Sequence, residues 1–244
     1  MDVGADMQGF DLFSWYMNIP PVSRIYFTSA FLTTTCCAVE IINPYYLYYN
    51  KELIFEGQVW RLISPFLFFG LFSVDFLFNM YFLIRHCRQL EEGDFRGKPS
   101  EFVLMIFFGI GMICLLTPFL QSHNFLGSAL TFMFTYVWGR RNEDVRMSMF
   151  GIITFSAPYL PWVMLAFGFL VGNAIDMSLI GIVVGHSYYF LKYVFPVVAE
   201  IRGWKRKELL VPPRVFRYIC GEELEDDHVQ MVAPRENEVH EHQD

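Results

Sequence analysis

Six stretches of mostly apolar residues, separated by polar or turn-rich breaks, organise most of this chain. They cover residues 22–42, 62–84, 102–120, 125–138, 158–172 and 177–195. Apolar stretches of this length and spacing are typical of helices that cross a membrane. We therefore expect an all-α polytopic membrane protein whose core is a bundle of six helices.

The distribution of basic residues predicts how these six segments are oriented across the membrane. Lys and Arg gather in the breaks at 85–101 and 139–147 and in the segment that begins at Arg202, whereas the breaks at 121–124 and 173–176 contain neither. Cytosolic loops of membrane proteins carry the excess of basic residues. This alternation places both termini in the cytosol, which agrees with an even number of spans.

Two of the expected helices are short. The segment 125–138 has fourteen residues, which make about 21 Å of helix against a hydrocarbon core of about 30 Å. Pro158 and Pro161 mark the start of the fifth span, so we expect Met147 to Ala157 to lie in the membrane interface. Short helices either draw the lipid surfaces together or shelter among their neighbours, and both alternatives stay open at this point.

The carboxyl end differs in composition from the rest. Residues 221–244 contain nine Asp and Glu and one Arg, a balance of −8, so the remainder of a chain with net charge −7 carries −7 + 8 = +1. So few apolar side chains cannot offset the entropy of ordering, and we expect a disordered tail that either solubilises the protein or binds a partner. The expected organisation is an N-terminal cytosolic segment (1–21), a membrane domain (22–196), a basic juxtamembrane segment (197–220) and this tail.

The composition narrows the class further. Hydrophobic residues make up 54% of the chain and 27 residues are Phe, which is too apolar for a soluble domain of this size. The five cysteines are odd in number and show no metal-ligand spacing. We expect no disulfide, metal, cofactor or nucleic-acid partner. The cluster Lys205 to Lys207, next to the last span, is typical of contacts with anionic lipid heads.

Polar residues inside the second expected span suggest a wet interior. Asp75 and Asn79 are four residues apart and therefore lie on one helical face. Both are costly to hold among acyl chains, so they should face a polar cavity or hold two helices together.

Small residues mark a close helix contact. Gly181 and Gly185 let another helix approach, and Ser178 extends the same face. The run of small residues that begins at Gly127 in the fourth span is suited to be the partner.

Trp60 and Arg61 stand at the lumenal side, just before the expected second span. The preceding segment 43–59 interleaves aromatic and charged residues and is interpreted as an amphipathic element in the lumenal leaflet. Interface anchoring alone would also explain it.

A Trp-Arg loop, an Asn in the second span and a Gly-xxx-Gly in the sixth, within six spans, resemble the rhomboid superfamily of intramembrane serine proteases. The chain departs from the protease pattern at three places: Ser178 stands where the catalytic His is expected, Asp75 replaces the oxyanion-side His, and Gly127 occupies the place of the nucleophile. The resemblance implies a rhomboid-like bundle without a serine-histidine dyad.

A shifted register would offer Ser128 as nucleophile and His186 as its base. Their depths in the two helices differ by about 10 Å at the helical rise, whereas a base must lie within about 3 Å of its nucleophile. This offset excludes the dyad unless one of the helices is broken, and His186 is interpreted as a helix-packing or cavity residue.

Several short blocks, in order, are similar to the Derlin family of rhomboid-like pseudoproteases. They are Ile19-Pro20-Pro21-Val22-Ser23-Arg24, Trp60-Arg61-Leu62, Phe78-Asn79-Met80, Leu90-Glu91-Glu92-Gly93, Phe95-Arg96-Gly97, Tyr136-Val137-Trp138, Arg140-Arg141-Asn142, Leu160-Pro161-Trp162-Val163 and Gly181 to His186. The resemblance implies a multi-pass protein of the endoplasmic reticulum that helps to extract misfolded polypeptides, with membrane ubiquitin ligases and a cytosolic AAA ATPase as partners. The Gly- and Phe-containing ATPase-docking motif found at the end of many animal members is absent after Gly221.

The sequence therefore predicts a non-enzymatic retrotranslocation factor that thins the bilayer. Asp75 and Asn79 would line its polar cavity, Gly181 and Gly185 would set the helix spacing, and Trp60-Arg61 would hold the lumenal loop. Further expected partners are membrane lipids and a homo- or hetero-oligomer. The alternatives are a residual intramembrane serine protease, which depends on Ser128, and a small-solute transporter, which the lack of similarity between the two halves of the chain disfavours.

Overall fold

The structure is a computed structural model that describes residues 12–119, 125–149, 153–170, 174–204 and 209–222. Residues 1–11 of the N-terminal segment lie outside the described residues. So do the cluster Lys205 to Lys207 and, from residue 223 on, the acidic tail.

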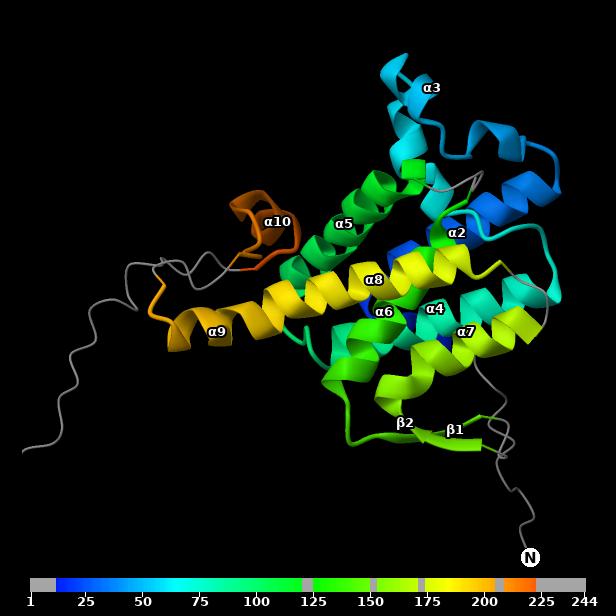
Figure 1. Ribbon diagram of the computed structural model, residues 1–244. Coiled ribbons are helices and arrows are strands. Elements are labelled where there is room, and N and C mark those ends of the chain that lie inside the picture. Colours follow the sequence, from blue (N-terminus) through cyan, green and yellow to red (C-terminus); the bar gives the residue numbers. More distant parts are fainter. Residues whose placement is uncertain (1–11, 120–124, 150–152, 171–173, 205–208, 223–244) are drawn as a thin grey trace, which may run out of the picture.

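Helices form most of the described chain, which confirms the expectation of a predominantly helical protein (Figure 1). Those that coincide with the six apolar stretches are α2 (Pro21–Ala38), α4 (Val74–Glu92), α5 (Pro99–Leu116), α6 (Gly127–Arg141), α7 (Leu160–Leu170) and α8 (Asp176–Tyr189). A π-helical turn, Phe190–Val194, joins α8 to α9 (Phe195–Ile201). The shorter helices are α1 (Leu12–Met17), α3 (Lys51–Phe55) and α10 (Arg214–Ile219).

Two of the described helices are long and apolar enough to cross a membrane by themselves. They are Pro99–Phe119, which includes α5, and Asp176–Ile201, which includes α8 and α9; Ala157–Leu170 is a shorter apolar helix. The number of six spans and the cytosolic position of both termini stay predictions.

The second apolar stretch is only partly helical, which corrects the expected span 62–84. Its first residues form 3₁₀ turns at Val59–Leu62 and Ser64–Phe66, and α4 begins only at Val74. The hydroxyl of Ser73 accepts a hydrogen bond from the backbone N–H of Phe76 at 3.2 Å and so caps the new helix. Hydropathy could not detect this boundary because the irregular residues before it are apolar too.

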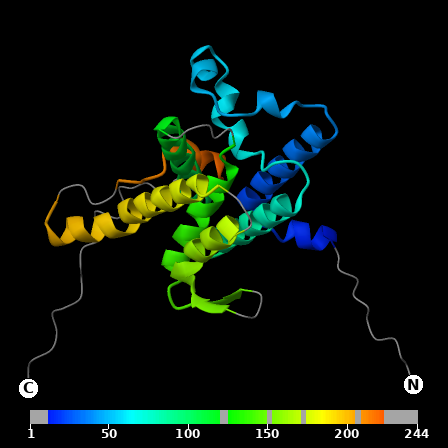
Figure 2. The same cartoon turned by 45° about the vertical axis from the view of Figure 1, so that its right-hand side comes forward.

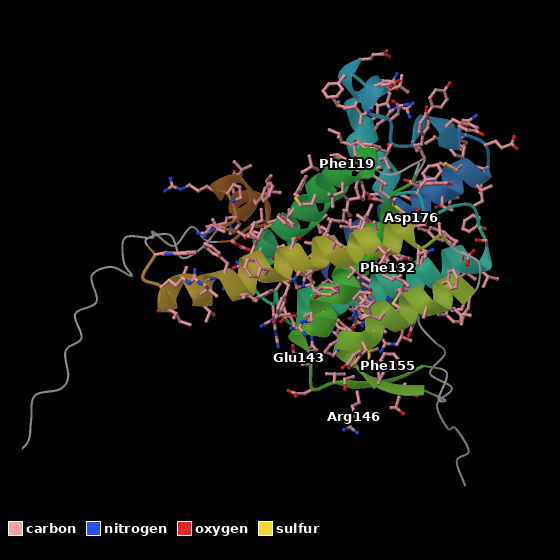
Figure 3. All side chains as sticks on the ribbon, viewed as in Figure 1. Phe119, Phe132, Glu143, Arg146, Phe155 and Asp176 are labelled. Atoms are coloured by element: carbon pink, nitrogen blue, oxygen red, sulfur yellow. The ribbon has the colours of Figure 1, made fainter. Side chains whose placement is uncertain are left out.

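The segment after α6 departs from the all-α expectation. Strands β1 (Arg146–Met149) and β2 (Ile153–Ser156) pair antiparallel, with Met147 opposite Phe155. The side chains of Met147 and Phe155 pack against the helical core, whereas the Arg146 side chain extends away from it (Figure 3). The expected interfacial segment is therefore a hairpin beneath the bundle.

Helix α6 forms the centre of the bundle. The side chains from Ala129 to Gly139 are all buried, and α4, α5, α7 and α8 pack around them (Figures 1 and 2). The fifteen residues of α6 make about 22 Å of helix, shorter than a hydrocarbon core of about 30 Å. Because its neighbours surround it, this short helix is sheltered inside the bundle over most of its length.

Two carboxylates from distant parts of the chain cap helix N-termini. Glu91, at the end of α4, accepts hydrogen bonds from the backbone N–H and hydroxyl of Ser23 at 2.7 and 2.6 Å and from the N–H of Val22 at 3.0 Å. Glu222 does the same for α5 through the N–H and hydroxyl of Ser100, at 2.8 and 2.6 Å. Both contacts place a negative charge at the positive end of a helix dipole. They tie α4 to α2 and the carboxyl segment to α5.

Candidate functional site

Glycines hold α6 and α8 side by side and parallel. A Cβ atom on Gly181 would overlap the backbone oxygen of Ala129, and one on Gly185 would lie 2.9 Å from Cβ of Tyr136 and 3.1 Å from the backbone oxygen of Met133. Both glycines therefore lie where only a hydrogen atom fits. Gly127 does not contact α8 in this way, since its Cα faces the ring of Phe69, 2.7 Å from the position of a Cβ.

A cavity of about 590 Å³ lies between α4, α6, α7 and α8. Asp75 and Asn79 of α4, Ser128 of α6 and Ser178 of α8 contribute to its wall. The side-chain amide of Asn79 donates a hydrogen bond to the backbone oxygen of Asp75 at 2.9 Å, so its carbonyl oxygen is left for other partners. The other ten lining residues are apolar or glycine, and we call this space the polar cavity after its four polar side chains.

An apolar groove of about 760 Å³ borders the polar cavity on the hairpin side. It lies between α4, α7 and the hairpin, and both spaces share Val74, Phe78, Phe82 and Phe167 as lining residues. We call it the α4–α7 groove. Its further lining residues are Leu77, Tyr81, Arg85, Gln89, Trp138, Val145, Arg146, Met147, Ser148, Phe155 and Leu160.

His186 and Ser128 lie at different levels of the paired helices α6 and α8. Nδ1 of His186 and the hydroxyl of Tyr136 share a hydrogen bond of 2.7 Å, whose donor depends on the tautomer of the imidazole. Ser128 stands eight residues before Tyr136 on α6, about 12 Å away along the helix. Among the described residues that line the polar cavity there is no histidine. The hydrogen bond of His186 to Tyr136 therefore places its imidazole well away from Ser128 along the helix pair.

Arg61 organises the loop that precedes α4. Its side chain is only 3% exposed and donates to the backbone oxygens of Tyr45 and Tyr48 at 3.2 and 2.8 Å and to the side chain of Gln58 at 2.8 Å. The guanidinium also lies over the ring of Tyr48, 4.6 Å from its centre. These contacts satisfy a buried charge locally and fold residues 45 to 61 into one unit.

Trp60 lies on the outside of this loop. Its indole N–H donates to the backbone oxygen of Tyr46 at 3.3 Å, and half of the side chain is exposed. Neither Trp60 nor Arg61 lines the polar cavity or the α4–α7 groove.

Sequence reasoning missed three polar side chains at the end of α4. Arg85 and Gln89 line the α4–α7 groove, and His86 is fully buried, with Nδ1 3.2 Å from the hydroxyl of Thr135. The expected span ended at residue 84 because charges begin there, whereas the helix continues to Glu92. The available signals were spacings along the helix: Arg85 and Gln89 share a face at i, i+4, and His86, eleven residues after Asp75, returns to the face of Asp75.

No group of three metal-binding side chains occurs in the part of the chain that the structure describes.

Known proteins with similar sequences point to one family. Residues 19–205 match the Der1-like family. Derlin-2 of Oryza sativa subsp. japonica is 43% identical over 231 residues, which cover 90% of this chain and 89% of the relative. Derlin-2.1 of Arabidopsis thaliana is 42% identical over 207 residues, 80% of this chain and 85% of the relative. A probable derlin-2 homolog of Dictyostelium discoideum is 39% identical over 195 residues, 77% of each chain.

Proposed function

This chain belongs to the Der1-like family, and we propose that it is a non-enzymatic factor that helps misfolded polypeptides leave the endoplasmic reticulum for the cytosol. Membership of the family supports a role in degradation associated with the endoplasmic reticulum in general. The observation that carries the finer proposal is the α4–α7 groove, which borders the polar cavity and shares four lining residues with it.

The proposed arrangement is a multi-pass protein of the endoplasmic reticulum membrane. Six helices cross the bilayer as a rhomboid-like bundle, and both termini face the cytosol. In this orientation the loop around Arg61 lies at the lumenal side, and the hairpin lies at the cytosolic side. The polar cavity and the α4–α7 groove then follow one another from lumen to cytosol.

The polar cavity followed by the α4–α7 groove lowers the free energy of moving a polypeptide across the bilayer. A charged side chain at the centre of a bilayer costs about 2.5 to 3.5 kcal/mol even on lenient insertion scales. Asp75 and Asn79, which line the polar cavity, would hold water that solvates such a side chain. The aromatic lining of the α4–α7 groove would receive the apolar ones.

Thinning of the bilayer is assigned to α7 rather than to the sheltered α6. The apolar helix Ala157–Leu170 has fourteen residues, about 22 Å, against a hydrocarbon core of about 30 Å. Trp162, Phe169 and Leu170 on this helix are half exposed or more. A short helix with an outward apolar face draws the lipid surfaces toward each other, beside the groove that clients would use.

The remaining site residues are given supporting roles. Trp60 and Arg61 would seat the lumenal loop that receives clients. Gly181 and Gly185 would set the distance between α6 and α8, with Ser178 on the same face of α8, so that the polar cavity keeps its width. Gly127 faces the ring of Phe69 and would instead allow the loop before α4 to approach the start of α6.

Partners follow from this role. They are misfolded client polypeptides, a membrane ubiquitin ligase complex, a cytosolic AAA ATPase, membrane lipids and further copies or relatives of the chain.

A degradation chase of a misfolded membrane client tests the proposal in cells that depend on this protein. Leu77 lines the α4–α7 groove and is 65% exposed, so Leu77→Trp should fill the groove and slow clearance. Leu115 on α5 is 63% exposed, so Leu115→Trp is the matched control away from the groove. Arg61→Ala and Gly185→Val should slow clearance too. Equal clearance rates for wild type and all four variants would contradict the proposal.

The residual serine protease is tested separately. Ser128 and Ser178 share the polar cavity, but the imidazole of His186 is engaged with Tyr136. Ser128→Ala is therefore expected to leave client clearance unchanged. Loss of a client cleavage product in this variant would instead support proteolysis.

A further inference from the structure

The outer edge of strand β1 presents unpaired backbone groups to the α4–α7 groove. The backbone N–H of Ala157 donates to the oxygen of Val145 at 2.8 Å, and the register places these two residues opposite each other. In an antiparallel ladder the backbone groups of successive residues point to opposite sides. Those of Val145 and Met147 therefore point toward β2, and those of Arg146 and Ser148 point outward.

The groove is lined by this backbone edge. Val145, Arg146, Met147 and Ser148 all contribute to its wall, whereas β2 contributes only Phe155. Side chains of successive strand residues alternate between two faces, and the Arg146 side chain extends away from the bundle (Figure 3). Because the Arg146 side chain extends away and that of Ser148 lies on the same face of the strand, we take these two residues to line the groove through their backbone. Within the described residues, Arg146 and Ser148 make no backbone hydrogen bond outside the ladder.

The opposite wall adds a donor and an acceptor that lack partners. Nε of Arg85 and Oε1 of Gln89 are both buried and have no hydrogen-bond partner among the described residues. The other end of the Arg85 guanidinium is held by the hydroxyl of Tyr81 at 2.6 Å. Buried polar atoms without partners are costly, so this pair is built to meet a ligand that both accepts and donates.

We propose that the α4–α7 groove binds its client as an extended strand added to the edge of β1. This inference rests on the proposed function and names the form in which that client is held. A polypeptide backbone supplies carbonyl oxygens and N–H groups in alternation, which suits Arg85, Gln89 and the free groups of Arg146 and Ser148 together. The phosphate of a lipid head could satisfy Arg85 but has no hydrogen to donate to Gln89.

The lining explains which clients fit. Phe78, Phe82 and Phe155 offer apolar surface beside the edge, and no Asp or Glu lines the groove among the described residues. Main-chain hydrogen bonds are independent of side-chain identity, so the site accepts many sequences provided that they are extended and largely apolar. This is the selectivity that a receptor for misfolded segments requires.

The test separates backbone recognition from apolar contact. Ser148→Pro removes an outward N–H and leaves the ladder intact, because proline is tolerated where the N–H of an edge strand faces away from its partner. Ser148→Ala is the matched control, since it removes the hydroxyl and keeps the N–H. The full-length protein is placed in phosphatidylcholine vesicles and exposed to a short peptide of alternating Val and Thr that carries a photoreactive benzoylphenylalanine. A twin peptide with N-methyl groups on alternate residues lacks the N–H groups of one edge.

Wild type and Ser148→Ala are expected to cross-link the parent peptide equally, at α4 and the hairpin. Loss of one net hydrogen bond lowers occupancy roughly five-fold, which is the decrease expected for Ser148→Pro; the N-methylated twin loses the bonds to both Arg146 and Ser148, so its decrease on wild type should be at least about five-fold. Equal yields from both peptides on wild type would overturn the proposal, as would a complete lack of cross-links at the groove. Thermal unfolding of both variants checks their folds; if Ser148→Pro unfolds, the comparison of the two peptides on wild type decides.

The outcomes also separate this inference from the proposed function. Slower clearance with Leu77→Trp, together with equal cross-linking of both peptides, would overturn strand addition alone. Edge-dependent cross-linking with normal clearance in Leu77→Trp would leave the strand site standing and refute the client route. Competition of both peptides alike by added phospholipid would identify a lipid as the occupant and would overturn the proposal.

Discussion

The close contact between α6 and α8 should respond to a single methyl group. Gly181→Ala and Gly185→Ala each add a Cβ where the backbone of α6 or its first side-chain atoms already lie. Gly111 in α5 is the matched control, because a Cβ added there meets nothing within 4 Å. All three glycines are inside helices, so the intrinsic effect of the substitution is the same.

The magnitude follows from two opposing terms. Replacing Gly by Ala inside a helix stabilises by about 0.5–1 kcal/mol, whereas overpacking costs about 1–3 kcal/mol. At Gly181 the obstacles are the backbone oxygen of Ala129 and, at 2.5 Å, Cβ of Phe132, neither of which can rotate away. We expect Gly181→Ala to lower the free energy of unfolding by about 1–2 kcal/mol and Gly185→Ala by up to about 1 kcal/mol, while Gly111→Ala raises it by about 0.5–1 kcal/mol.

Titration with sodium dodecyl sulfate, followed by circular dichroism of the purified protein in mixed micelles, measures the order of the three variants. The order predicted from the contacts is Gly111→Ala most stable, then Gly185→Ala, then Gly181→Ala. If Gly181→Ala were as stable as Gly111→Ala, the helices would not approach as closely as the structure has them, and the reasoning would be refuted.

Two further predictions concern the carboxylates that cap helices. Glu91→Gln should lower the free energy of unfolding by about 1–2 kcal/mol, because three charge-assisted contacts at the start of α2 become neutral. Glu92 is exposed, so the control Glu92→Gln should change this free energy by less than about 0.5 kcal/mol. Equal effects of the two substitutions in the same detergent titration would contradict the capping role. Burial raises the pKa of the Cys220 thiol, and the carboxylate of Glu222 raises it further. Glu222→Gln should therefore lower this pKa and shift the midpoint of the pH profile of Cys220 alkylation to lower pH, and an unshifted midpoint would count against the contact.

Hydropathy predicted the helices that are apolar along their whole length. The third and sixth stretches became α5 and α8 with small changes at their ends. The predicted start of the second helix was wrong because residues 62–71 are mostly apolar although their backbone is irregular. Gly70 adopts a positive φ of 95°, which ends any regular element before α4. The hydropathy pattern did not predict the hairpin, because two strands of four residues each are too short for a periodic signal.

The candidate site was predictable only within single helices. Asp75 and Asn79 share a face by their spacing, and both line the polar cavity in the structure. Their meeting with Ser128 and Ser178 depends on how three helices pack, which no local pattern encodes. The same holds for Glu91, whose contact with α2 joins residues 68 positions apart.

The thickness of the bilayer around the protein tests the central claim most directly. Electron cryomicroscopy of the full-length protein in lipid nanodiscs would show the lipid surfaces beside α7 and beside α5 in one map. The helix Pro99–Phe119 has 21 residues, about 31 Å, and therefore matches an undisturbed core of about 30 Å. The account predicts a hydrocarbon layer about 5–10 Å thinner beside α7 than beside α5. A layer of uniform thickness around the whole protein would contradict it.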